Sequence, residues 1–269
     1  MKILFIGDII GKPGRRIVHD ELETIVADRQ IDLVVANCEN SAAGFGVTVD
    51  IAERLLEAGV HVLTSGNHIW DKREAHAYMD RRPELIRPAN YPEGAPGGGV
   101  CVGTTVGGVP YAVINLQGRV YLPAIDCPFR KADELLDSLG DDVKVRMIDL
   151  HAEVTSEMVA FGWYVDGRVS AVVGTHTHIP TADERVLPAG TAYITDVGMT
   201  GPHDSIIGMD RTASLGRFLN AMPARFEPAT DNPRLNGVVI AADETTGLAT
   251  AITRVNHSMA ELEHLSAEA

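Results

Sequence analysis

Polar side chains that suit metal binding recur where short apolar runs of the sequence end. They are Asp8, Glu39, Asn40, Asn67, His68, His151, His176 and His178. Carboxylates, amide oxygens and neutral imidazoles together suit borderline cations such as Mn, Fe and Zn, and suit a calcium cage poorly. The set is long enough for two ions, and two metals about 3.5–4 Å apart clamp a phosphoryl group for in-line attack.

Taken one at a time, these residues have plainer explanations. An Asp after a strand is most often a loop or capping residue, and a lone His151 is more often a half-buried imidazole than a ligand. Glu39 and Asn40 can simply open a turn, and Asn67 can end a strand in a left-handed conformation. Five strand ends that each present a metal-competent side chain are hard to obtain from independent turns, so the joint pattern favours a metal site.

The apolar runs indicate the strands that position these residues. Residues 2–6, 33–36, 60–63, 145–150 and 171–173 are typical of strands buried on both faces. Amphipathic stretches follow residues 13–14 and the potential cap at residue 48, and this alternation predicts a largely parallel sheet. Ligands bind at the carboxyl ends of such strands, which is where the polar residues fall.

Later segments predict antiparallel pairs. Residues 100–106 and 109–116 flank a Gly-Gly turn, and residues 237–242 and 249–255 form a similar pair. We therefore expect an α/β fold of two mixed β-sheets packed face to face and flanked by helices, in a single domain over 1–269. Residues 258–269 are expected to form a polar helix or a frayed end.

Composition excludes several classes of protein. The chain has 269 residues, of which 45% are hydrophobic, and its mean hydropathy is +0.02. A substantial buried core is therefore expected, and a disordered or fibrous chain is not. The net charge of −14 argues against stable nucleic-acid binding, yet a small anionic substrate stays open because bound cations invert the local potential.

Cysteine usage and the apolar runs bear on location. Cys38, Cys101 and Cys127 are odd in number and widely spaced, which indicates a reducing cytosol rather than a disulfide framework. The apolar runs fall short of the roughly 18 residues of a membrane span, and Asp8 interrupts the first of them. We expect a cytoplasmic protein that does not bind membranes, with a homo-oligomer left open.

The ordered blocks of the sequence resemble those of the calcineurin-like metallophosphoesterases. These blocks are Gly7-Asp8, Asn37-Cys38-Glu39-Asn40, Gly66-Asn67-His68, His151 and Gly174-Thr175-His176-Thr177-His178. The resemblance extends over nearly the whole chain in one subgroup, the bacterial YmdB-like phosphodiesterases that act on 2',3'-cyclic nucleotides. It implies an α/β/β/α metallophosphoesterase sandwich with a dinuclear centre of Fe or Mn, with Zn as an alternative.

Carried over by position, the resemblance implies two groups of ligands that share Glu39. One metal takes Asp8, Glu39 and His178, and the other takes Glu39, Asn67, His151 and His176. Two departures stand out. The family's Asp-x-His opening is here Asp8-Ile9-Ile10, and its Gly-Asp-x-x-Asp block is replaced by residues 37–40. We expect Asn40 to supply the oxygen that replaces the missing imidazole.

Three further residues are candidates for contact with a substrate. His68 is expected to face the substrate and to protonate the departing oxygen or stabilise transition-state charge, while a metal-bound hydroxide attacks phosphorus. Phe45 is a candidate for stacking on a base, and His203 for folding over the site. A plain glycine loop and a surface turn are the alternative explanations for Phe45 and His203.

These expectations combine into one function with two alternatives. We expect a dinuclear metal-dependent phosphodiesterase that hydrolyses small phosphodiesters, with 2',3'-cyclic nucleotides implied by the resemblance. The first alternative is a phosphomonoesterase or protein phosphatase on the same fold. The second is a low-turnover signalling module that binds a nucleotide and acts through a partner.

Overall fold

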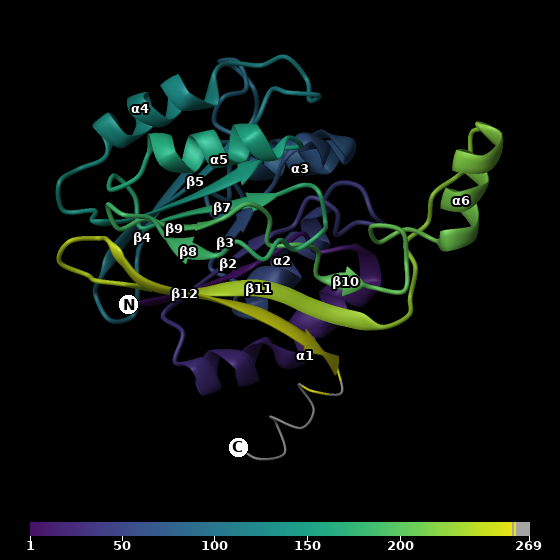
Figure 1. The fold of residues 1–269 in the computed structure, drawn as a ribbon, viewed down its shortest axis with the longest axis horizontal. Helices are drawn as coiled ribbons and strands as arrows, with labels where there is room; N and C mark the ends of the chain where they lie inside the picture. Colours follow the sequence, from purple (N-terminus) through teal and green to yellow (C-terminus); the bar gives the residue numbers. More distant parts are fainter. Residues whose placement is uncertain (260, 262–269) are drawn as a thin grey trace.

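Two β-sheets stacked on each other form the centre of the computed structural model, which describes residues 1–259 and 261 (Figure 1). In the first sheet the strand order is β10-β11-β1-β2-β3, with β12 paired to β11. Its strands are β1 (Lys2–Ile6), β2 (Leu33–Asn37), β3 (Val62–Thr64), β10 (Gly201–Pro202), β11 (Pro233–Ala242) and β12 (Ala249–Ser258). The strands β1, β2 and β3 are parallel, and β11 is antiparallel to its neighbours.

The second sheet has the order β4-β5-β6-β7-β9-β8. Its strands are β4 (Val100–Thr104), β5 (Pro110–Gln117), β6 (Val145–His151), β7 (Ala171–Thr175), β8 (Arg185–Val186) and β9 (Ala192–Ile194). The four central strands are parallel, and β4 and β8 are antiparallel edges. Both sheets are therefore mixed, as the sequence predicts, and the two predicted antiparallel pairs are present as β4–β5 and β11–β12.

Helices cover the outer face of each sheet. Those on the first sheet are α1 (Gly11–Arg29), α2 (Val49–Glu57) and α3 (Arg73–Met79), and those on the second are α4 (Pro128–Ser138) and α5 (Thr155–Tyr164). A hydrophobic layer between the sheets includes Phe5 and Val35 from one side and Val113 and Met147 from the other. The order of layers is thus α/β/β/α, which confirms the predicted sandwich.

Local sequence signals account for where two of these helices begin. The hydroxyl of Thr48 accepts a hydrogen bond from the backbone N–H of Ile51 at 3.3 Å, so Thr48 caps α2 as predicted. The helix α1 begins at Gly11, and Pro13 falls in its first turn, where a missing N–H leaves no hydrogen bond unmade.

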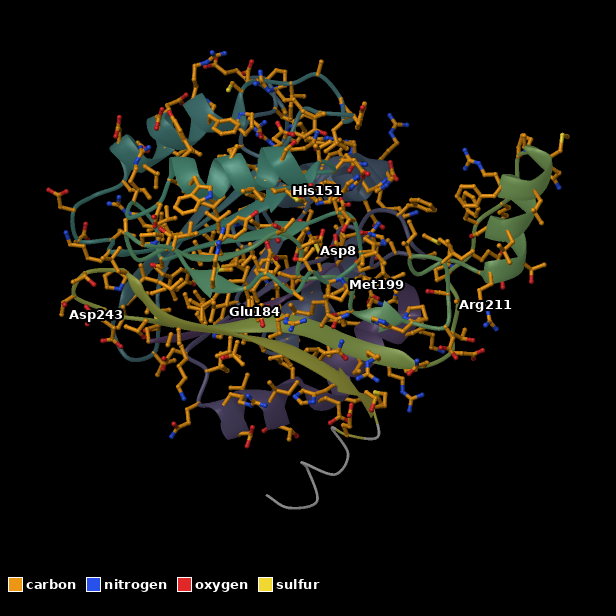
Figure 2. The ribbon with its side chains drawn as sticks, viewed as in Figure 1. Asp8, His151, Glu184, Met199, Arg211 and Asp243 are labelled. Atoms are coloured by element: carbon orange, nitrogen blue, oxygen red, sulfur yellow. The ribbon has the colours of Figure 1, made fainter. Side chains whose placement is uncertain are left out.

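The helix α6 (Arg211–Asn220) stands apart from this layered body (Figure 1). It projects outward and leaves Phe218 and Leu219 more than four-fifths exposed. Figure 2 shows Arg211 at the start of this helix, away from Asp8 and His151 in the body. Among the described residues, no helix is both long and apolar enough to cross a bilayer. The prediction for 258–269 falls mostly outside the described residues.

Candidate metal centre

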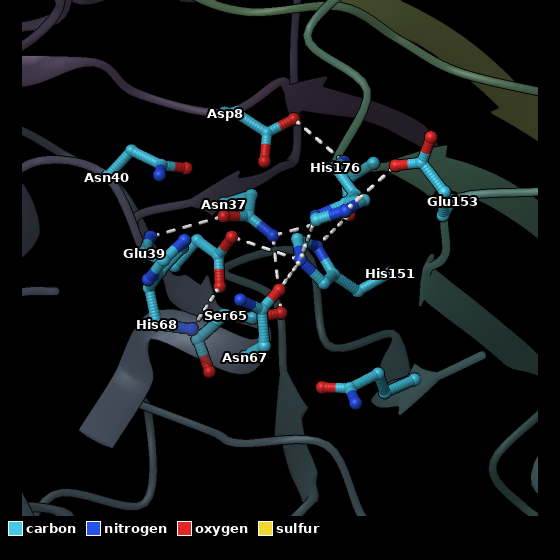
Figure 3. A network of polar contacts seen from close by, with 12 residues as sticks. Asp8, Asn37, Glu39, Asn40, Ser65, Asn67, His68, His151, Glu153 and His176 are labelled. Carbon is cyan, nitrogen blue, oxygen red and sulfur yellow. Dashed lines mark hydrogen bonds and ion pairs between the residues drawn. The ribbon is translucent and has the colours of Figure 1, made fainter. Parts of the chain in front are cut away.

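The proposed ligands come from the ends of strands in both sheets. His151 is the last residue of β6, and the short 3-10 helix that follows β3 begins at Asn67. The remaining ones, which lie one to three residues beyond a strand, are Asp8 after β1, Glu39 and Asn40 after β2, and His176 and His178 after β7. Figure 3 shows Asp8, Glu39, Asn40, Asn67, His151 and His176 around one space. The structure therefore brings together the residues that the sequence singles out.

The ring of His151 is at the centre of the closest contacts. Its Nε2 lies 3.0 Å from Oε1 of Glu39, 3.0 Å from Oδ1 of Asn67 and 3.0 Å from Nδ1 of His176. Ligand atoms that bind one metal at about 2.1 Å and at right angles to each other are about 3.0 Å apart. Glu39, His151 and His176 thus have the spacing of ligands to one ion.

Two buried acceptor oxygens at the site, Oδ1 of Asp8 and Oδ1 of Asn40, have no hydrogen-bond donor among the described residues, and both residues are at most 2% exposed. A third buried oxygen, Oε1 of Glu39, forms no well-aligned hydrogen bond but lies 3.0 Å from Nε2 of His151. A buried acceptor without a partner costs about 1–3 kcal/mol, and more when it is charged. Cations placed among these oxygens would satisfy all three, so the residues present fit metal ions.

The amide of Asn40 is oriented for this role. Its Nδ2 donates to the carbonyl oxygen of Gly44 at 3.0 Å, which fixes Oδ1 as the atom without a partner. This is the oxygen expected from the sequence to stand in for the missing imidazole. In that opening block, Ile9 and Ile10 are buried in the core instead.

The two carboxylates at the site have opposite pKa shifts. Burial alone would raise the pKa of Glu39, but the neighbouring imidazoles of His151 and His68 outweigh it and lower that pKa to about 2. Burial and the nearby charge of Asp196 hold the pKa of Asp8 well above its ordinary value. Without a cation, the carboxyl group of Asp8 is therefore harder to ionise than that of Glu39.

The imidazoles of His151 and His176 also have opposite pKa shifts. Burial would lower the pKa of His151, but the carboxylates of Glu39, Asp8 and Asp149 raise it to about 9. Burial and the charge of His151 lower the pKa of His176 to about 3, so the ring of His176 is neutral and its lone pair is available to a metal.

The loop after β7 is held in an unusual backbone conformation. His176 and His178 have φ values of 104° and 65°, in a region that residues other than glycine seldom adopt. Nδ1 of His178 donates to the carbonyl oxygen of Ile207 at 2.8 Å, and the backbone N–H of His176 donates to Oδ2 of Asp8 at 3.3 Å. Such conformations persist where the surroundings over-determine them, often at functional sites.

Close approach of the backbone to His151 requires a glycine at position 66. A Cβ atom on Gly66 would lie 2.2 Å from Cδ2 of the His151 ring. Real Cβ atoms do not approach ring carbons so closely, because the two van der Waals surfaces would overlap. The glycine of the Gly66-Asn67-His68 block is therefore there to make room for the imidazole.

A cavity of about 760 Å³ opens onto the site. Glu39, Asn40, His68, His176 and His178 line it together with Phe45, Arg217 and Phe226. The rings of Phe45 and His68 meet edge to face at 5.1 Å, and Nδ1 of His68 is 2.9 Å from Oδ2 of Asp71. This volume suits a small ligand.

His203 is the one candidate that the structure places elsewhere. Its ring contacts the carbonyl oxygen of Met199 at 3.3 Å and Nδ2 of Asn236 at 3.0 Å, and it does not line the cavity. His203 is therefore not among the residues that we propose to contact the substrate.

Sequence reasoning missed several polar residues beneath the ligands. Asp149 is fully buried within β6, and Asp196 accepts from the backbone N–H and hydroxyl of Thr177 at 3.0 and 2.8 Å. One signal was available for Asp149, because a lone acid inside an apolar run is buried only if donors surround it. Asp71, which contacts His68, carries no comparable signal.

Known proteins are similar to this one over nearly the whole chain. The model of the YmdB-like protein family matches residues 4–255. A Bacillus subtilis protein named 2',3'-cyclic-nucleotide 2'-phosphodiesterase is 50% identical over 255 residues, which cover 95% of this chain and 96% of that protein.

Two crystal structures are similar over nearly their full length. One, of a hypothetical protein from Thermus thermophilus, is 40% identical with a TM-score of 0.89, and the match covers 96% of this chain and 99% of that one. The other, of a novel phosphatase from Mycoplasma pneumoniae, is 35% identical with a TM-score of 0.90, and the match covers 96% and 93%.

Proposed function

The chain belongs to the YmdB-like family, and from this membership and the geometry of the site we propose that it is a dinuclear metal-dependent phosphodiesterase of small phosphodiesters. One observation carries the proposal: the buried Oδ1 atoms of Asp8 and Asn40 have no donor among the described residues, and they lie at the same site as Glu39 and His151. We propose 2',3'-cyclic nucleotides as substrates because the Bacillus subtilis relative is named for them.

The proposed ligands form two groups on either side of Glu39. Asp8, Asn40 and His178 would hold one ion with Glu39, and Asn67, His151 and His176 would hold the other with Glu39. When bound, Fe, Mn or Zn ions supply positive charge that polarises a phosphoryl group and lowers the pKa of water. Glu39 is fully buried, His151 contacts one of its oxygens, and the backbone N–H of His68 donates to the other at 2.9 Å. We propose that its carboxylate is shared by the two groups.

His68 is the proposed proton donor to the departing oxygen. Asp71 accepts from its Nδ1, so Nε2 is the ring nitrogen that we propose to face the leaving group. The ring lines the cavity and is held between Asp71 and the edge of Phe45. The chain thus orients a general acid without using it as a metal ligand.

The rest of the cavity is proposed to hold the nucleoside. Its lining is mainly apolar and includes Phe45, Ile207 and Phe226, with Arg217 packed over the ring of Phe226 at 5.3 Å. An aromatic wall of this kind stacks on any base, so we expect little discrimination between bases.

Metal analysis combined with a substrate panel tests this proposal. We expect about two metal ions per chain, turnover of 2',3'-cAMP and of bis(p-nitrophenyl) phosphate, and loss of both activities on chelation. Full activity of the chelated, metal-free protein would refute the metal mechanism. A clear preference for monoesters would instead favour a phosphomonoesterase, the alternative supported by the similarity to the Mycoplasma pneumoniae phosphatase.

A further inference from the structure

One buried carboxylate beneath the proposed metal centre accepts hydrogen bonds from three other strands. Oδ2 of Asp149 accepts from Oγ1 of Thr64 at 2.5 Å and from Nδ2 of Asn37 at 3.1 Å. Oδ1 of Asp149 accepts from Oγ1 of Thr175 at 2.7 Å. Since β2 and β3 belong to one sheet and β6 and β7 to the other, this single side chain joins the two sheets.

Each partner in this network stands just before a proposed ligand. Thr64, Asn37 and Thr175 are the last residues of β3, β2 and β7. The network residue and the ligand that follows it are Asn37 and Glu39, Thr64 and Asn67, Asp149 and His151, and Thr175 and His176. The strand ends that Asp149 joins are therefore those that carry the ligand group centred on His151.

Thr175 extends the network to the ring of His151. Its Oγ1 lies 3.0 Å from Nδ1 of His151. A hydroxyl has one proton, and Thr175 donates it to Asp149, so the Thr175 oxygen must accept from Nδ1–H of His151. This leaves Nε2 of His151 facing Glu39 and Asn67, which is the orientation that a metal ligand needs.

We propose that Asp149 is the positioning residue of this site: it joins the ends of β2, β3 and β7 and, through Thr175, holds the His151 ring with Nε2 toward the other ligands. The inference rests on the proposed function, because it takes these residues as metal ligands. A carboxylate is needed because the side chains that meet it all donate. An amide would place an NH₂ group against a donor from Asn37 or Thr175.

Variants at Thr175 test this role without removing any ligand. Thr175→Val keeps the shape but leaves Nδ1–H of His151 and Oδ1 of Asp149 without partners, and Thr175→Ser restores the hydroxyl. We expect the Val variant to bind Mn²⁺ about 10- to 100-fold more weakly than the wild type, as measured by calorimetry on the metal-free protein. The Ser variant is expected to stay within a few-fold of the wild type.

Thr195→Val is the matched control for stability. The Thr195 hydroxyl donates to Oδ2 of Asp183 at 2.5 Å, a part-buried threonine–carboxylate bond that involves none of the proposed ligands. We expect this variant to lower the Tm without changing the Mn²⁺ affinity. Asp149→Asn is expected to weaken Mn²⁺ binding at least as much as Thr175→Val, and the Thr175 series carries the test if Asp149→Asn does not fold.

The possible outcomes separate this inference from the proposed function. Wild-type affinity for Mn²⁺ in Thr175→Val would overturn the positioning role alone and leave the metal site standing. An equal loss of affinity in Thr195→Val would also overturn it, because the effect would then be general destabilisation. A wild-type protein that binds neither Mn²⁺ nor Fe²⁺ nor Zn²⁺ would overturn both proposals.

Discussion

Removal of the His68 imidazole tests the proposed proton donor most directly. His68→Ala keeps the backbone N–H that donates to Oε2 of Glu39 at 2.9 Å, so we expect the metal content to stay at the wild-type level. A positioned general acid contributes about 10²- to 10⁴-fold, which corresponds to about 2.7–5.4 kcal/mol of activation free energy. We expect kcat to fall within that range for a substrate with a poor leaving group.

Replacement of Asp71, the partner of His68, is expected to have a smaller effect on kcat. The side chains of His68 and Asp71 are 29% and 41% exposed, so their ion pair is well solvated. Such pairs contribute about 0.2–1 kcal/mol, which is about a 1.4- to 5-fold effect. We therefore expect Asp71→Asn to cost only a few-fold, while His68→Ala costs orders of magnitude.

The choice of substrate makes the assay decisive. The departing oxygen of 2',3'-cAMP is an alkoxide that needs a proton, whereas p-nitrophenolate leaves without one. In His68→Ala, turnover of 2',3'-cAMP should fall far more than turnover of bis(p-nitrophenyl) phosphate. Equal losses with both substrates would refute proton donation, and a parallel loss of bound metal would show that His68 acts on the ligands instead.

Two further predictions concern the ligands and their charges. Glu39→Gln replaces one of the two ligand oxygens by an NH₂ group, and elemental analysis of the purified variant should show loss of metal; full occupancy would contradict the bridging role. In the metal-free protein, burial raises the pKa of Asp196 to about 7, and the surrounding carboxylates raise that of His151 to about 9 against the effect of burial. The folded protein keeps these protons where the unfolded chain has lost them, so Asp196 costs stability as the pH rises from about 4 to 7, and His151 loses its stabilising contribution from about pH 6.5 to 9. The Tm in chelator should therefore fall from about pH 6 to 9, and a rising Tm would contradict these shifts.

The positions of the ligands could be predicted from the sequence because parallel strands deliver their following residues to one edge. The run 33–36 is apolar throughout, so it must be buried on both faces, and the polar Glu39 and Asn40 must follow its end. His151 likewise ends the largely apolar strand β6. Convergence of these residues then follows from the parallel order of strands and needs no side-chain detail.

Other parts of the structure carry no such signal. The strands β8 and β10 are two residues long, and β10 contains Pro202, so neither shows a periodic pattern. The role of Asp149 depends on donors from Thr64 and Thr175, which lie 85 and 26 residues away along the chain. Partners at such separations are fixed by how the sheets stack, which no local pattern describes.

The absence of a side chain at Gly66 links its evolutionary history to that of His151. A methyl group there would displace the imidazole, so neither position is free to drift alone, although 85 residues separate them in the chain. Among descendants of this protein, a lineage that acquires a larger residue at 66 is expected to have already lost the histidine or to have rebuilt its surroundings. A larger residue at position 66 therefore marks divergent copies in which the place of the imidazole has been lost or rebuilt.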